Sequence, residues 1–161
     1  TLLGAKEFVA GVMHSASSGL YSLLPAVIYL VACGLAFATG TSWGTFGILI
    51  PIVTEVFKAD FTLMIVGVSA CLAGAVFGDH VSPISDTTIM ASAGAECKHV
   101  HHVSSQLPYA LTVACVSFLT FVVAGFTHTL GMVTSAIISW IFGVAMLGFA
   151  LFYLNKRQKG K

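Results

Sequence analysis

One short polar segment contains the residues of this chain that can bind ions or move protons. It reads Gly78-Asp79-His80-Val81-Ser82-Pro83-Ile84-Ser85-Asp86-Thr87-Thr88, and apolar sequence lies on both sides of it. An ionisable side chain costs roughly 3 kcal/mol or more at the centre of a bilayer. Two carboxylates so close together in apolar surroundings indicate a functional use, so we expect the chemistry of the chain in this segment.

Asp86 is the stronger candidate of the two carboxylates. It lies among the hydroxyls of Ser85, Thr87 and Thr88, and it follows Pro83, which interrupts helical hydrogen bonding. Hard cations prefer oxygen ligands. Burial raises the pKa of a carboxylate and a bound cation lowers it, so one such group holds either a proton or a cation. We predict a Na⁺ and proton site at Asp86 with Ser85 and Thr87 as ligands. The structural alternative is an aspartate that caps the next helix.

The remaining residues of this segment have two interpretations each. Asp79 is either a second ion-binding or titratable group or an anchor that holds the segment in place. His80 is either a proton relay, because imidazole titrates near neutrality, or the partner of Asp79. Ser82 and Thr88 add hydroxyl oxygens, and Gly78 allows close approach of the backbone.

A second polar interruption reads Thr39-Gly40-Thr41-Ser42-Trp43-Gly44-Thr45. Unwinding a helix inside a membrane frees carbonyl groups that coordinate a cation. We predict that the hydroxyls of Thr41, Ser42 and Thr45 bind the ion and that Gly40 and Gly44 let the backbone come close. The alternative is close helix packing through small residues.

Composition determines the class of protein that positions these segments. Of the 161 residues, 57% are hydrophobic and 8% are charged, against about 25% charged in a soluble domain. The chain is therefore predicted to be an all-α polytopic membrane protein with a single transmembrane domain over residues 1–161. Its net charge of +1 gives no reason to expect a nucleic-acid partner. Its four cysteines form no CxxC pair, so neither zinc nor a disulfide framework is indicated.

The apolar runs predict the individual elements. Each arm of 24–57 has only about 12–15 residues, fewer than the ~20 that cross a bilayer, which favours a re-entrant hairpin over a single broken crossing. The predicted elements are the end of a spanning or interfacial helix over 1–20, the hairpin or broken helix over 24–57, a broken helix over 62–95, spanning helices over 107–126 and 131–154, and a tail over 155–161.

The basic residues of the tail predict the orientation. Lys156, Arg157, Lys159 and Lys161 place it in the cytoplasm by the positive-inside rule, and a bacterial inner membrane is the expected location. The chain begins without Met, so we expect the C-terminal half or a fragment of a longer protein.

Histidines outside the two polar segments are expected to be peripheral. His99, His101 and His102 offer no helical i,i+4 pair and only Glu96 as a nearby carboxylate, so a cytoplasmic loop is favoured over a metal site. A pH-sensing role has no support in the sequence. His128 is expected at a membrane interface.

Both polar segments together resemble the NhaC-type Na⁺/H⁺ antiporter family. The segment Gly40-Thr41-Ser42-Trp43-Gly44-Thr45 is similar to that family's G-[ST]-S-W-G-T pattern. The segment that follows Phe77 is similar to its G-D-x-x-S-P-[IL]-S-D-T-T pattern, and Gly94, His99 and His102 resemble the same region. The likeness covers roughly residues 35–125.

This resemblance implies a fold of the ion transporter superfamily. Such a fold has inverted repeats, each with a re-entrant hairpin and a broken helix. Residues 40–45 would form the hairpin tip and residues 79–88 the helix break, and the two would meet at the substrate site. The chain holds about one repeat. The expected partners are therefore membrane lipid and either an N-terminal half or a homologous subunit, and a homo-oligomer is expected.

The expected function is exchange of Na⁺ for H⁺ by alternating access, with no enzymatic activity and no cofactor. Relatives also couple Na⁺ or H⁺ to small organic acids or amino acids. The only arginine is Arg157, in the tail, which favours an inorganic cation over a carboxylate substrate. Rivals from other classes are an intramembrane metalloenzyme using His80, Asp79 and Asp86, a passive channel, and a regulatory or packing subunit.

Overall fold

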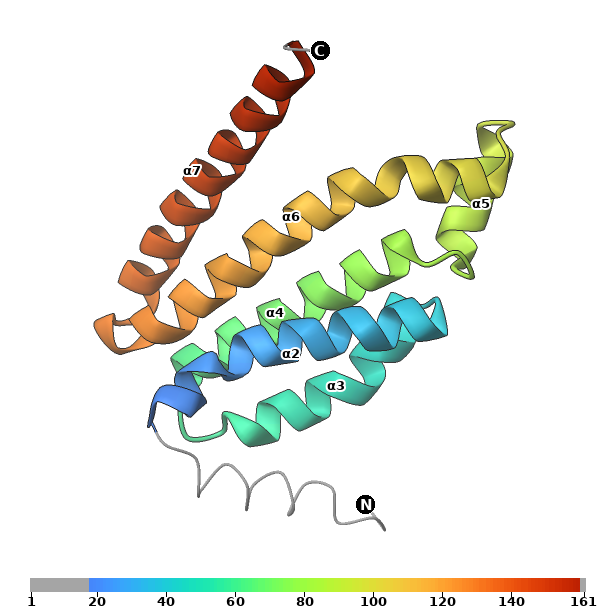
Figure 1. Cartoon of the computed structure of the whole chain (residues 1–161). Coiled ribbons are helices and arrows are strands. Elements are labelled where there is room, and N and C mark those ends of the chain that lie inside the picture. Colours follow the sequence, from blue (N-terminus) through green and yellow to red (C-terminus); the bar gives the residue numbers. More distant parts are fainter. Residues whose placement is uncertain (1–17, 160–161) are drawn as a thin grey trace.

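The computed structural model describes residues 18–159, which are helical apart from short connections. In chain order the elements are α2 (Ser18–Thr39), α3 (Ser42–Val56), α4 (Phe61–Val81), α5 (Asp86–Gly94), α6 (His99–Thr127), the 3-10 helix η1 (His128–Leu130) and α7 (Met132–Lys159) (Figure 1). The helices α2, α4, α6 and α7 are long and apolar enough to cross a membrane. The predicted all-α class is confirmed. The predicted element over 1–20 lies almost entirely outside the described residues.

The helices α2 and α4 run side by side in the same direction and touch through their backbones (Figure 1). Ala32 and Ala36 of α2 are fully buried. They face Gly74 and Gly78 of α4, where an added Cβ would lie 3.0 Å from Ala32 and 2.9 Å from Ala36. A Cβ at Gly78 would also collide with the carbonyl oxygen of Cys33. Small residues therefore hold these two helices at the short distance typical of membrane helix pairs.

Helix α3 turns back along α4 and closes the larger of two apolar clusters. The ring of Phe57, just after α3, is fully buried and lies where a Cβ at Gly67 of α4 would be. The buried members of this cluster are Leu24, Val53, Phe57, Leu63 and Cys71. The cluster fixes α3 against α2 and α4 at the end opposite the polar segments.

Helix α6 packs against α2 and α4, and α7 packs chiefly against α6 (Figure 1). The rings of Tyr29 and Phe121 are 5.4 Å apart, and a Cβ at Gly125 would collide with the carbonyl oxygen of Ser22. On α7, large apolar side chains are exposed, with Trp140 at 72% and Phe152 at 69%. The apolar surface of this helix fits a lipid environment.

The predicted boundaries of the hairpin need correction. Helix α2 has 22 residues and includes Pro25, whereas α3 has 15. The length argument for a re-entrant hairpin therefore fails for α2, which is long enough to cross alone. The reason is that one proline removes one helical hydrogen bond without ending the helix. Residues 42–45 of the predicted polar interruption form the first turn of α3. Only Gly40 and Thr41 therefore lie between the two helices.

Other boundaries also differ from the sequence prediction. Helix α4 continues through Asp79, so the break covers only residues 82–85. Helix α6 begins at His99 and contains Pro108, so residues 99–106 are not a loop. Helix α7 extends through most of the predicted tail, to Lys159.

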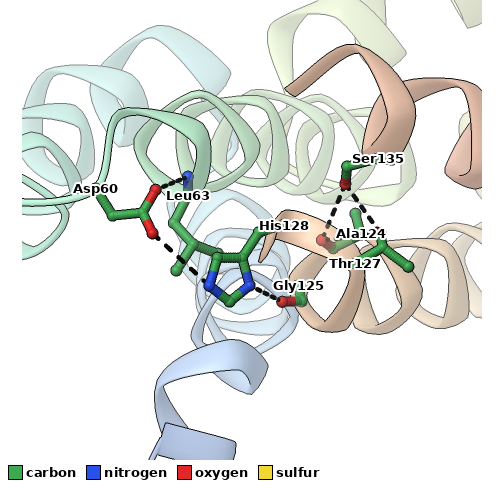
Figure 2. Close-up of polar contacts among 7 residues, drawn as sticks. All are labelled: Asp60, Leu63, Ala124, Gly125, Thr127, His128 and Ser135. Atoms are coloured by element: carbon green, nitrogen blue, oxygen red, sulfur yellow. Dashed lines mark hydrogen bonds and ion pairs between the residues drawn. The ribbon is translucent and has the colours of Figure 1, made fainter. Parts of the chain in front are cut away.

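Polar contacts tie the chain together at the end opposite the two polar segments (Figure 2). The Asp60 carboxylate accepts the backbone N–H of Leu63 at 2.9 Å and so caps α4, and its other oxygen is 3.7 Å from Nε2 of His128. Nδ1 of His128 donates to the carbonyl of Gly125 at 2.6 Å. His128 is therefore a half-buried link between two turns, and its place at a membrane interface stays a prediction.

Candidate ion-binding site

The two polar segments meet at one end of the helices. Gly40 ends α2 with φ +67°, a conformation that suits glycine, and a Cβ there would lie 2.9 Å from the carbonyl oxygen of Ile84. The fully buried hydroxyl of Ser82 donates to the carbonyl of Phe37 at 2.8 Å. The break between α4 and α5 is therefore docked on the turn between α2 and α3.

Asp79 lies in the last turn of α4, and its side chain is buried beside this break. The Ser85 hydroxyl donates to Oδ1 of Asp79 at 2.6 Å, and Ser85 is fully buried. The hydroxyls of Ser85 and Thr87 are 2.7 Å apart. Because the single hydrogen of Ser85 goes to the carboxylate, Thr87 donates to Ser85. A chain of two hydroxyls thus leads from the exposed Thr87 to the buried carboxylate.

The Asp79 carboxylate has no cationic partner within the described part of the chain. It is 8% exposed, and neither of the two ion pairs that occur among residues 18–159 includes it. Burying a carboxylate costs free energy unless it is paired or hydrogen-bonded, and Ser85 supplies a hydrogen bond to Asp79. The Asp79 carboxylate and the two hydroxyl oxygens are therefore candidate ligands for a hard cation.

Asp86 has a different environment from the one the sequence predicted. Its side chain is exposed at the first position of α5, and its Oδ1 accepts the backbone N–H of Thr87 at 2.7 Å. The hydroxyls of Ser85 and Thr87 form the series of hydrogen bonds that leads to Asp79, and they do not surround Asp86. Successive residues at the start of a helix project about 100° apart, which separates Asp86 from Ser85. An ion-binding role of Asp86 stays a prediction.

The hydroxyls of the other segment complete the first turn of α3. Thr41 caps this helix by accepting the backbone N–H of Gly44 at 3.4 Å, and Thr45 donates to the carbonyl of Thr41 at 2.9 Å. Ser42 and Thr45 are buried. A Cβ at Gly44 would lie 2.9 Å from the methyl group of Thr41, so the lack of a side chain at Gly44 makes room for the Thr41 cap. Ion binding by the three hydroxyls stays a prediction.

Several predicted site residues make contacts that hold the break, and ion binding by them stays a prediction. The space beside Gly78 is filled by the backbone of α2, which this glycine allows to come close. Ser82 gives its hydrogen to α2, and Thr88 donates to the carbonyl of His80 at 3.2 Å. The His80 side chain is exposed, and no hydrogen bond joins it to Asp79 in the described structure.

The first residues of α6 also hold the break, and the sequence prediction missed them. Nε2 of His99 is 2.7 Å from the carbonyl oxygen of Pro83, and Nδ1 is 3.0 Å from the Ser92 hydroxyl. Gln106 donates to the carbonyl of His80 at 2.6 Å. The useful signal was the seven-residue spacing of His99 and Gln106, because residues seven apart lie on the same face of a helix. The sequence prediction placed residues 99–106 in a loop and therefore missed this shared face.

The residues proposed for a metalloenzyme are not grouped. Asp79 is buried, whereas His80 and Asp86 are exposed. Within residues 18–159, no cluster of three His, Cys, Asp or Glu side chains could hold a metal ion.

Comparison with known proteins decides the family. Residues 2–126 match the Na⁺/H⁺ antiporter family. The chain belongs to that family. With its four apolar helices it is an integral membrane protein of a transporter family, not an enzyme. The resemblance inferred from the two polar segments is confirmed.

Curated relatives extend well beyond this chain. An uncharacterized protein of Haemophilus influenzae is 50% identical over 66% of this chain and 21% of its own length. An uncharacterized Na⁺/H⁺ antiporter of the same organism is 34% identical over 68% of this chain and 24% of its own length. The malate-2H⁺/Na⁺-lactate antiporter of Bacillus subtilis is 32% identical over 68% of this chain and 24% of its own length. The chain thus spans less than a quarter of these relatives. No solved structure matches it significantly.

Proposed function

We propose that this chain forms the ion-binding part of a secondary transporter that exchanges Na⁺, or a similar monovalent cation, for H⁺ by alternating access. One observation carries the proposal. Asp79 is a buried carboxylate with no cationic partner in the described residues, and it lies where the two polar segments meet. Membership of the Na⁺/H⁺ antiporter family supports the same function.

The chemistry at Asp79 is a competition between two cations for one carboxylate. A proton neutralises the carboxylate on one side of the membrane, and Na⁺ replaces it on the other. The oxygens of Ser85 and Thr87, at 2.6 Å and 2.7 Å along the hydroxyl chain, supply hard ligands beside the carboxylate. Asp86, exposed at the start of α5, is the second titratable group of the proposal and attracts cations to the entrance.

The test uses the full-length protein in proteoliposomes with an imposed pH gradient. We expect Asp79→Asn to abolish gradient-driven Na⁺ uptake, because asparagine keeps the size of the side chain and loses the charge. Glu55→Gln is the matched control, since Glu55 forms only an exposed pair with Lys58 at 3.7 Å. Asp86→Asn tests the second carboxylate and is expected to reduce uptake less. Full uptake by a folded Asp79→Asn protein would overturn the proposal.

A second candidate is exchange of organic acids coupled to Na⁺ and H⁺. It is favoured by the relative named as a malate-2H⁺/Na⁺-lactate antiporter, which is 32% identical over 68% of this chain. Asp79 would then bind the coupling ion. Malate or lactate added to the same proteoliposomes separates the candidates, because only an organic-acid exchanger takes up Na⁺ in a malate- or lactate-dependent manner.

The orientation belongs to the same proposal. We place the C-terminus in the cytoplasm of a bacterial inner membrane, because Lys156 and the basic residues after it follow the last apolar span. Helix α7 then runs outward-to-inward and α6 the opposite way, so the end with both polar segments faces the cytoplasm. In the proposal α2 crosses the membrane and the shorter α3 turns back from its end, within one inverted repeat. The other repeat comes from a longer chain or a homologous subunit, in a homo-oligomer.

A further inference from the structure

Ser139 of α7 carries a buried hydroxyl group that has no hydrogen-bond partner within the described part of the chain. The residue is 8% exposed, and its Oγ is closed off from solvent. Other hydroxyls of these helices donate to a carbonyl one turn earlier. Ser69 donates to Ile65 at 2.8 Å, and Thr120 donates to Val116 at 2.8 Å. A buried hydroxyl without a partner costs free energy, so a partner for Ser139 is expected from outside the described residues.

The orientation of Ser139 follows from two contacts between α6 and α7, one turn on each side of it. One turn earlier, the Ser135 hydroxyl donates to the carbonyl of Ala124 at 3.3 Å (Figure 2). One turn later, Gly143 has no side chain, and a Cβ there would lie 3.1 Å from Oγ1 of Thr120. Residues four apart are neighbours on one face of a helix, so Ser139 also faces α6.

Two cavities meet at Ser139. They lie between α4, α6 and α7 and have volumes of about 300 Å³ and 190 Å³. Thr120, Phe121 and Ser139 line both of them. A water molecule takes up about 30 Å³ in the liquid. There is therefore room for a small molecule at the point where the hydroxyl of Ser139 lacks a partner.

The hydroxyls around these cavities offer both a donor and acceptors. The hydrogens of Thr120 and Ser69 are directed to carbonyls of their own helices, so their oxygens keep the capacity to accept. Ser139 supplies a hydrogen that no described residue accepts. A ligand that satisfies both kinds of group accepts a hydrogen bond from Ser139 and donates one to Thr120.

The charge of the lining determines the class of ligand. None of the described residues that line the two cavities is charged. An ion there would be buried without a counter-charge, which costs much more free energy than burial of a neutral polar molecule. A buried water is neutral, both donates and accepts, and needs two to four polar partners. The hydroxyls at this point meet that requirement.

We propose that Ser139 and Thr120 bind an ordered water molecule between α6 and α7. The water accepts the hydrogen of Ser139 and donates to Oγ1 of Thr120. It thereby satisfies the buried hydroxyl of Ser139 and links the two helices midway between their direct contacts at Ser135 and Gly143. This site does not depend on which ion binds at Asp79.

Hydroxyl-radical footprinting of the full-length protein in lipid nanodiscs tests the proposal. An X-ray pulse forms radicals from bound water as well as from bulk water, and mass spectrometry locates the side chains that they oxidise. Phe121 lines both cavities, so its oxidation reports the bound water. Ser139→Ala removes the donor. Ser104→Ala is the matched control, because the exposed Ser104 hydroxyl bonds within its own helix at 2.6 Å.

We expect oxidation of Phe121 in the wild-type protein and in Ser104→Ala, and its loss in Ser139→Ala. A wild-type protein without oxidation of Phe121 would overturn the proposal, because lipid or another helix of the longer protein would then fill the space. Equal oxidation in Ser139→Ala would also overturn it, because bulk water would then reach Phe121. If Ser139→Ala fails to fold, Thr120→Val keeps the side-chain size, removes the acceptor and is expected to give the same loss.

An electron microscopy map of the full-length protein that resolves water gives the geometry directly. The expected result is a density peak about 2.5–3.0 Å from both Oγ of Ser139 and Oγ1 of Thr120. A Ser139 hydroxyl bonded instead to the carbonyl of Ser135, or to a side chain of another helix, would contradict the proposal.

Discussion

The hydroxyl of Ser82 donates a 2.8 Å hydrogen bond to the carbonyl oxygen of Phe37, 45 residues earlier in the chain. The last carbonyls of a helix have no partner within it, and Phe37 lies in the last turn of α2, which ends at Thr39. Ser82 therefore completes the end of α2 and fastens the α4–α5 break to the α2–α3 turn. Together with the close approach of Gly40 to Ile84, this contact brings the two polar segments of the sequence together.

Ser82→Ala is expected to destabilise the protein by about 0.5–1.5 kcal/mol, because it removes the hydrogen bond that the fully buried Ser82 donates to the carbonyl of Phe37. Denaturant unfolding in detergent micelles measures the change. Ser104→Ala is the control, since the Ser104 hydroxyl is exposed and bonds only within its own helix, to Val100 at 2.6 Å. Equal effects of the two substitutions would contradict this account of the break.

Gly78→Ala is expected to destabilise the α2–α4 pair by about 1–3 kcal/mol, because overpacking shifts the backbone. The added methyl group would collide with the carbonyl oxygen of Cys33. Gly34→Ala on α2 is the matched control, because nothing lies within 4 Å of a Cβ there. Thermal unfolding of both variants provides the comparison. A Gly78→Ala protein as stable as Gly34→Ala would show that the helices are not in backbone contact.

Asp60→Ala is expected to cost about 0.5–2 kcal/mol of stability, the range for loss of a helix N-cap. Asp60→Asn should cost much less, because the amide oxygen still accepts the N–H of Leu63 and only the 3.7 Å pair with His128 is lost (Figure 2). Unfolding of the two variants side by side separates the cap from the ion pair. If asparagine costs as much as alanine, the pair rather than the cap holds this end.

Ser85→Ala is expected to weaken the apparent affinity for Na⁺ by roughly tenfold or more, because a hydrogen bond to a charged group contributes about 1.5–3 kcal/mol. In the proposed function, this substitution removes the 2.6 Å contact to Asp79 and one oxygen ligand. Na⁺ uptake as a function of Na⁺ concentration measures the effect. Ser69→Ala, an exposed serine that bonds within its own helix, should leave the affinity unchanged.

The apolar runs predicted where helices occur, but prolines misled the prediction of their ends. Pro25 and Pro108 both lie inside helices, because each removes only one hydrogen bond while packing of the flanking turns maintains the helix. The loop assignment around His99 was wrong for the same reason. Local polarity was a reliable guide to the breaks and a poor guide to helix length.

The choice between the two carboxylates was beyond the reach of the sequence. Asp79 and Asp86 both lie among polar residues, and the hydroxyls next to Asp86 made it the better local candidate. Asp79 is the buried one, beside the break that Ser82 fastens to Phe37, and no local pattern encodes such a long-range contact. The structure therefore moves the proposed ion site to Asp79, although the segment itself was predictable.

Infrared difference spectroscopy on the purified full-length protein shows whether Asp79 is the carboxylate that exchanges a proton for Na⁺. Addition of Na⁺ at constant pH should remove the carbonyl stretching band of one protonated carboxylic acid, because Na⁺ displaces the proton held by Asp79. We expect this change in the wild-type protein and in Asp86→Asn, and its absence in Asp79→Asn. An unchanged band loss in Asp79→Asn, with no loss in Asp86→Asn, would contradict it and assign the ion to Asp86.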